Sequence, residues 1–135
     1  MNPPSEPLAP NEGARLAATE VMTQEHGLAL RASQCMACGK CTFPASTICP
    51  FCLHESLRDL PLVGKASLYS FTRVHAAPVN WQTPYALGYA DFPNGLRLLA
   101  KLADATTDWR ADQPVVLKVV AAGEGFRYFL EGAAA

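Results

Sequence analysis

The order of apolar and polar positions divides the chain into a short helical stretch followed by strands. Apolar residues from Ala14 to Met22 recur at helical spacing, with Asn11 as an N-cap and Gly27 as a terminator, so this pattern predicts one helix over about residues 12–26. Residues 1–11 have several prolines and no such period, and we expect a mobile tail there. The weak apolar face of the helix suggests that it packs on another surface.

From residue 28 onward the apolar period changes to that of β-strands. Leu28, Leu30 and Ala32 alternate with other residues, which predicts a strand over 28–34, and residues 57–64 read as a proline-containing connection. Five further strands are predicted over 65–75, 85–92, 96–102, 115–121 and 126–130. Asn94-Gly95 predicts a type I′ hairpin turn, and Gly88 suggests a bulge in the second of these strands. Five strands, the first of them long, indicate a small OB-fold barrel.

All five cysteines fall in one segment, with the spacing Cys35-x2-Cys38-x2-Cys41-x7-Cys49-x2-Cys52. Two CxxC pairs joined by a hairpin-length stretch are typical of a zinc ribbon, in which each pair forms a tight knuckle around one metal. Gly39 follows Cys38, and a knuckle needs positive φ at that place, so Cys35 and Cys38 form the better first pair and Cys41 is the spare thiol.

Thiolate ligands alone do not determine the identity of the metal. Four cysteines also hold mononuclear iron, and an iron–sulfur cluster is disfavoured because the ferredoxin run continues x3-Cys-Pro. Cys41 reads as a small apolar residue, with an alternative-ligand or redox role as the other interpretation. His54 reads as a surface histidine beside the metal, or else as a substitute ligand. Four protein ligands leave no open position, so a metal here would be structural.

Composition excludes several classes of protein. Eleven Lys and Arg balance twelve Asp and Glu, so no basic stripe for nucleic acid is evident. No apolar run approaches the ~20 residues of a membrane span, and no secretory signal is recognisable, so we expect a reducing cytoplasm. His26, His54 and His75 lie in three separate regions and every cysteine lies in the metal segment. The sequence therefore offers no constellation for autonomous catalysis.

Taken together, the order of motifs resembles a known family. The motifs are C-x2-C-G, Phe43-Pro44, C-P-x-C, a strand ending in Val74-His75, a Pro-Tyr-Ala-Leu-Gly segment, and the Asn-Gly hairpin leading into Leu-Leu-Ala-Lys-Leu. This pattern resembles the acyl-CoA-associated zinc-ribbon/OB-fold proteins, once catalogued as a domain of unknown function, over about residues 12–131. Within that family it is similar to small subunits of thiolases such as benzoylsuccinyl-CoA thiolase.

The resemblance implies a fold, a metal and a role. It implies an N-terminal helix (12–27), a rubredoxin-like zinc ribbon (28–58) and an OB-fold (59–135), with one structural Zn²⁺ on Cys35, Cys38, Cys49 and Cys52. Cys41 and Leu53 depart from the usual pattern. It also implies a non-catalytic subunit that partners a thiolase-type acyl-CoA enzyme; subunits of hydratase or aldolase complexes are the alternative.

A single-strand nucleic-acid module of the same fold is a second alternative, for which the charge balance supplies no groove. Candidate contacts to CoA or a partner are, from their residue types, Arg73, Trp81, Tyr85, Arg97 and Lys101. Each of these also has a plain structural interpretation, because aromatic side chains can cover the barrel core and surface cations are often only solvated.

Overall fold

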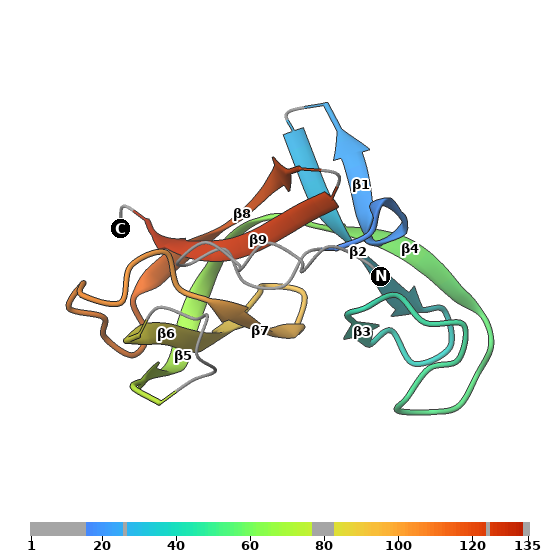
Figure 1. Cartoon of the computed structure of the whole chain (residues 1–135). Coiled ribbons are helices and arrows are strands. Elements are labelled where there is room, and N and C mark those ends of the chain that lie inside the picture. The colour runs from blue at the N-terminus through green and yellow to red at the C-terminus, as the bar shows by residue number, and fades with distance from the viewer. Residues whose placement is uncertain (1–15, 26, 77–82, 124, 134–135) are drawn as a thin grey trace.

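The computed structural model describes residues 16–25, 27–76, 83–123 and 125–133, and the regular elements of this part are strands in two sheets, apart from one 3₁₀ turn (Figure 1). The predicted mainly-β class with an OB-fold is confirmed. The first sheet holds β1 (Val21–Gln24), β2 (Gly27–Cys35), β3 (Cys41–Thr42) and β4 (Leu57–Leu62). The second has the order β7-β6-β5-β8-β9, from β5 (Gly64–Val74), β6 (Tyr85–Asp91), β7 (Arg97–Lys101), β8 (Pro114–Ala122) and β9 (Gly125–Gly132).

The prediction of a helix over residues 12–26 is wrong where the structure describes this segment. Only Ala18–Glu20 form a short 3₁₀ turn, labelled η1, and Val21–Gln24 form strand β1. Strand β1 pairs antiparallel with β2, Val21 opposite Leu30, and Gly27 opens β2 instead of ending a helix. Pairing to an adjacent strand therefore overrides a weak helical period. Residues 12–15 lie outside the described part.

Strand β4 joins the two sheets, although its residues read as a connection in the sequence. It pairs with β2 along its whole length, Leu30 opposite Leu62 and Cys35 opposite Leu57. Only Val63 separates it from β5. Pro61 fits because β4 pairs on one side only, so the missing N–H breaks no ladder on the other side. The result is one long β4–β5 run that links the cysteine segment to the barrel (Figure 1).

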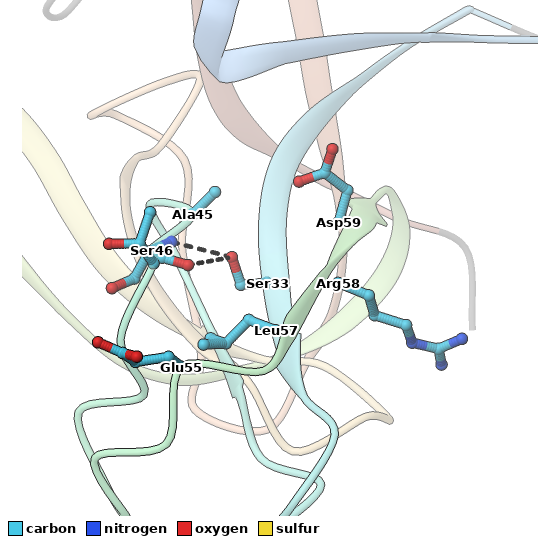
Figure 2. A pocket seen from close by; sticks show the side chains of 8 residues that line it. Ser33, Ala45, Ser46, Glu55, Leu57, Arg58 and Asp59 are labelled. Atoms are coloured by element: carbon cyan, nitrogen blue, oxygen red, sulfur yellow. Dashed lines mark hydrogen bonds between the residues drawn. The ribbon is translucent and has the colours of Figure 1, made fainter.

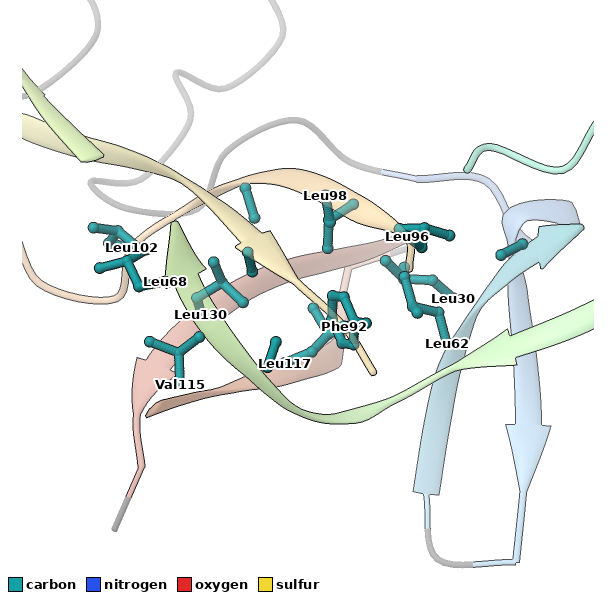
Figure 3. Close-up of a cluster of buried hydrophobic side chains, with 14 of the residues drawn as sticks. Leu30, Leu62, Leu68, Phe92, Leu96, Leu98, Leu102, Val115, Leu117 and Leu130 are labelled. Atoms are coloured by element: carbon teal, nitrogen blue, oxygen red, sulfur yellow. The ribbon is translucent and has the colours of Figure 1, made fainter. Parts of the chain in front are cut away.

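The core lies inside the five-stranded sheet, which curls until β7 and β9 approach each other. The Ala103 N–H donates to the carbonyl of Leu130 at 2.8 Å, and Leu102 bridges to Leu130. Figure 3 shows the buried side chains that fill the interior: Leu68, Leu98, Leu102, Val115, Leu117 and Leu130. Leu30 and Leu62 of the first sheet pack beside Phe92 and Leu96 at one end of this core (Figure 3), so the two sheets share one hydrophobic cluster.

The β6–β7 hairpin differs in detail from its prediction. Gly95 has φ of 90°, but Asn94 has no positive φ, so the turn is not type I′. Gly95 donates its N–H to the Phe92 carbonyl, and the Asn94 side chain accepts from the Leu96 N–H, as in a type I turn closed by a glycine bulge.

A bulge does occur near Gly88, but it lies on the neighbouring strand β5, between Leu68 and Ser70, which pair with Ala90 and Tyr89. Gly88 itself lies in the core, where an added Cβ would stand 2.8 Å from Leu68 Cδ1 and 3.1 Å from the Ser70 carbonyl oxygen. A glycine at this place lets the two strands approach closely. No helix among the described residues is long and apolar enough to cross a membrane.

Candidate metal centre

Four cysteine sulfurs meet at the loop ends of the first sheet. The Sγ atoms of Cys35, Cys38, Cys49 and Cys52 all lie within 4.8 Å of one another. Two of the pairs are 3.5 Å (Cys35 to Cys52) and 3.6 Å (Cys38 to Cys49) apart. A tetrahedral site with Zn–S bonds of about 2.3 Å has sulfurs about 3.8 Å apart along each edge, so the spacing fits one tetrahedral ion.

The two CxxC loops are built in the same way. Gly39 donates its N–H to the carbonyl of Cys35 at 2.9 Å, and Leu53 donates to the carbonyl of Cys49 at the same distance. Gly39 has φ of 78° and Leu53 has φ of 67°. Leu53 thus occupies the place that suits glycine, and it adopts the left-handed conformation despite its Cβ. The sequence departure at Leu53 changes the residue but not the knuckle geometry.

Backbone amides point at the sulfurs and favour their ionised form. The N–H groups of Cys38 and Ala37, against the effect of burial, lower the pKa of the Cys35 thiol to about 6. Burial opposes ionisation of Cys49, yet the N–H groups of Cys52 and Phe51 outweigh it and lower the pKa of that thiol. These amides prepare the knuckles to present thiolates.

Cys52 shows why a cation is needed. The backbone N–H of His54 favours its thiolate, but burial and the three neighbouring cysteines together raise the pKa of Cys52 to about 12. Four sulfurs this close cannot all ionise unless a positive ion sits among them. The described residues can therefore hold a metal, and a soft all-thiolate set suits Zn²⁺ or iron.

Cys41 lies apart from this group. It belongs to β3 opposite Gln34, is buried, and forms part of the shared hydrophobic cluster. Burial raises the pKa of its thiol, with the Arg58 charge opposing, so it is kept as a neutral thiol. His54 is exposed, and its Nδ1 lies 3.4 Å from the Cys52 sulfur, where it contacts a candidate ligand without joining the four-sulfur group.

The residues expected to contact CoA or a partner do not form a single site in the described part. Tyr85 and Lys101 lie together, the ammonium 5.0 Å from the ring centroid. Arg97, at the opposite end of β7, makes a two-point contact with Asp91 at 2.6 and 3.0 Å. Arg73 donates to the carbonyls of the loop after β7, at 2.8 and 2.7 Å. Trp81 lies outside the described residues.

A hollow of about 310 Å³ lies between the cysteine segment and strands β2 and β4 (Figure 2). Its one buried polar residue, Ser33, is satisfied by the segment itself: the Ser46 N–H donates to the Ser33 hydroxyl at 2.9 Å. Figure 2 shows the Arg58 side chain turned away from the hollow, and its Nε donates to Gln34 at 2.9 Å. We assign no ligand to this hollow, because its buried polar group already serves to hold the hairpin to the sheet through the Ser33–Ser46 contact.

The fold and the four sulfurs define the class: a cysteine ribbon joined to an OB-fold. Residues 60–120 match the family described as "ChsH2, C-terminal OB-fold domain". The solved structure "Ltp2-ChsH2(DUF35) aldolase" matches with a TM-score of 0.66 at 24% identity, over 78% of this chain and 86% of that one, which shows the shared fold.

Three curated proteins are similar to this chain in sequence. The benzoylsuccinyl-CoA thiolase subunit BbsA of Thauera aromatica is 37% identical over 90 residues, 67% of this chain and 62% of that protein. BbsA of Geobacter metallireducens is 31% identical over 88 residues, 65% and 60% respectively. A "DUF35 domain-containing scaffold protein" of Methanocaldococcus jannaschii is 31% identical over 74 residues, 53% and 52%.

The chain thus spans about 60% of the length of the thiolase subunits it matches. It is homologous to these proteins, and its residues 60–120 match the model of the ChsH2 C-terminal OB-fold domain. The resemblance stated from the sequence motifs is confirmed.

Proposed function

We propose that this chain is a non-catalytic, zinc-binding accessory subunit of an acyl-CoA-processing enzyme of the thiolase type. The observation that carries the proposal is the likeness to two thiolase subunits, at 37% and 31% identity. In this role the chain works in the cytoplasm, in a hetero-oligomer, and supports assembly or completes the acyl-CoA site of its partner.

The site chemistry supports an accessory role. The four clustered thiols fill a tetrahedral shell by themselves, so a metal held by them has no open position for a substrate. The fifth cysteine is buried with a raised pKa, which is the opposite of what a nucleophilic thiol needs. The metal's contribution is to fold the ribbon: Cys35, Cys38, Cys49 and Cys52 hold it, and without it residues 31–57 lose their structure.

Contacts to CoA or to the partner are also a proposal. Tyr85 and Lys101 together offer an aromatic ring and a cation at the strand ends of β6 and β7. Arg73 and Arg97 would share their guanidinium groups between present partners and a CoA phosphate. The same engagement of cations within the chain argues against a basic groove for single-stranded nucleic acid in the described residues.

Copurification tests the function. The tagged full-length chain is recovered from the organism that encodes it, and its companions are identified by mass spectrometry while the metal is measured by elemental analysis. We expect a thiolase-type acyl-CoA enzyme and one zinc per chain. A hydratase or aldolase companion would contradict the thiolase assignment, and recovery of nucleic acid alone would contradict the accessory role.

A further inference from the structure

Large apolar side chains surround the candidate metal centre and face solvent. Met36, Ile48, Phe51 and Leu53 are 61%, 47%, 57% and 74% exposed. Each is the chain neighbour of a cysteine in the four-sulfur group, so all four project around one centre. We name this surface the knuckle tip. Figure 1 shows the loops of this segment at the ends of β2 and β4.

The fold has no use for these side chains in its core. None of the four belongs to the shared hydrophobic cluster, although Cys41 of the same segment does. A ribbon of this kind is stabilised by its metal rather than by apolar burial. Contiguous apolar groups that are exposed without stabilising their own chain mark a surface for another molecule.

Leu53 gives the strongest indication. Its φ of 67° places an L-residue in the left-handed conformation, which its Cβ disfavours, while Gly39 meets the same requirement in the other knuckle without that strain. The Leu53 side chain gains little from contacts within its own chain, because 74% of the residue is exposed. Backbone strain that the chain itself does not repay indicates a functional contact.

Charge and position indicate the occupant. Cys38 is exposed within the tip, and four thiolates around one divalent ion would leave this centre net negative, while the Lys40 ammonium lies over the Phe51 ring, 4.8 Å from its centroid. The complementary surface is apolar and carries a basic side chain. A hollow of about 400 Å³ is lined by Cys38, Lys40 and Phe51 and by the Asn94–Gly95 turn of the barrel. It therefore lies between the tip and the barrel, where a partner bound to the tip could make further contacts.

We propose that the knuckle tip is the anchor by which this chain docks on its acyl-CoA enzyme subunit, against an apolar patch with a basic side chain facing Cys38. The inference rests on the proposed function and specifies which surface serves it. Phe51 and Leu53 are the side chains expected to enter the partner, since burying these large, exposed apolar groups removes the most apolar surface from water.

The test uses the purified acyl-CoA enzyme that copurifies with the wild-type chain, titrated by calorimetry with full-length variants. The tip variant is Phe51→Ser with Leu53→Gly, and Leu53→Gly is also made alone because it should fold at least as well as wild type. The matched control is Val63→Ser, at an apolar residue between β4 and β5 that is 51% exposed and lies outside both the tip and the proposed contact residues. Zinc content and melting temperature are measured for each.

We expect the tip variant to bind on the order of 30-fold more weakly, Leu53→Gly about fivefold more weakly, and the control within threefold of wild type, all with full zinc. Binding of the zinc-loaded tip variant within threefold of wild type would overturn the inference while leaving the accessory role intact. A change in self-association of the chain, seen by light scattering, would assign the tip to a second copy instead. If no acyl-CoA enzyme copurifies at all, the proposed function fails first and the inference with it.

Discussion

The two knuckles allow a paired test of backbone strain at the metal centre. Gly39 and Leu53 hold equivalent places, each donating to a cysteine carbonyl at 2.9 Å with φ of 78° and 67°. A Cβ added at Gly39 would meet no atom within 4 Å, so Gly39→Ala tests the backbone conformation free of any steric clash. Leu53→Gly is the reverse change in the other knuckle.

The magnitude follows from two opposing effects. An L-residue in the left-handed region costs about 1–2 kcal/mol, and alanine recovers about 0.4–1 kcal/mol by restricting the unfolded chain. Gly39→Ala should therefore cost about 1 kcal/mol. Because a ribbon folds with its metal, that cost appears as metal affinity reduced roughly fivefold. Leu53→Gly removes the strain and should raise affinity by about two- to fivefold.

The assay is competition for zinc against a chromophoric chelator, with both variants and wild type at one pH. Unchanged affinity in Gly39→Ala would refute the claim that positive φ is needed there. A loss of more than tenfold in Leu53→Gly would show that the leucine side chain stabilises its own knuckle, which would also remove the argument from strain at the tip.

Three further outcomes follow from the structure. Gly88→Ala should destabilise the barrel by about 1–3 kcal/mol, because its Cβ would meet Leu68 at 2.8 Å, while Gly132→Ala, with its nearest atom at 3.7 Å, should be neutral or slightly stabilising in urea titrations. Cys41→Ser should keep one zinc per chain and Cys38→Ser should lose it, as elemental analysis would show; zinc loss in the first would place Cys41 among the ligands. Burial raises the pKa of Tyr128, so the folded state holds the phenol proton more tightly than the unfolded state does. The contribution of Tyr128 to the free energy of unfolding is therefore complete below about pH 10, the unfolded pKa, and is lost as pH rises toward the folded pKa. Tyr128→Phe should reduce this alkaline loss of stability, measured by circular dichroism.

Strands with strict alternation could be predicted from the sequence, because alternation directly encodes which face is buried. In β7, apolar and charged residues alternate, and the structure follows this pattern: Leu98 and Ala100 are buried, 3% exposed each, and Arg97 faces solvent. Lys101 follows the alternation but is only 8% exposed, since its stem packs and its ammonium lies over Tyr85. Alternation gives a side chain's direction, whereas its burial depends on neighbours from other strands.

The pairing of one strand with another could not be predicted from the period of a single segment. Residues Val21–Gln24 take the strand conformation only because β2 lies beside them, and a single-segment period cannot show that. Pro61 made β4 look like a connection, although a one-sided pairing tolerates it. Trp109 stands in the largely polar stretch between the predicted strands 96–102 and 115–121, yet it is 5% exposed and its indole N–H donates to the Asp104 carbonyl at 2.6 Å. A large apolar residue such as tryptophan in a polar stretch was the one signal that could have revealed this core residue.

The candidate metal centre was more predictable than the fold around it, because the spacing of cysteines along a short segment is enough to identify the ligands. Two CxxC pairs and Gly39 selected the four cysteines that the structure brings together, and they separated Cys41 from them. The equivalence of Leu53 with Gly39 needed φ values, since a leucine after the second pair carries no sign of positive φ.

Separated subunits give the most direct test of the accessory role. Acyl-CoA turnover is measured for the zinc-loaded chain alone, for its acyl-CoA enzyme partner alone, and for the two mixed at equal concentration. The account predicts no turnover by this chain alone and a clear gain in the mixture over the partner alone. Turnover by this chain alone, or a mixture no faster than the partner, would contradict it.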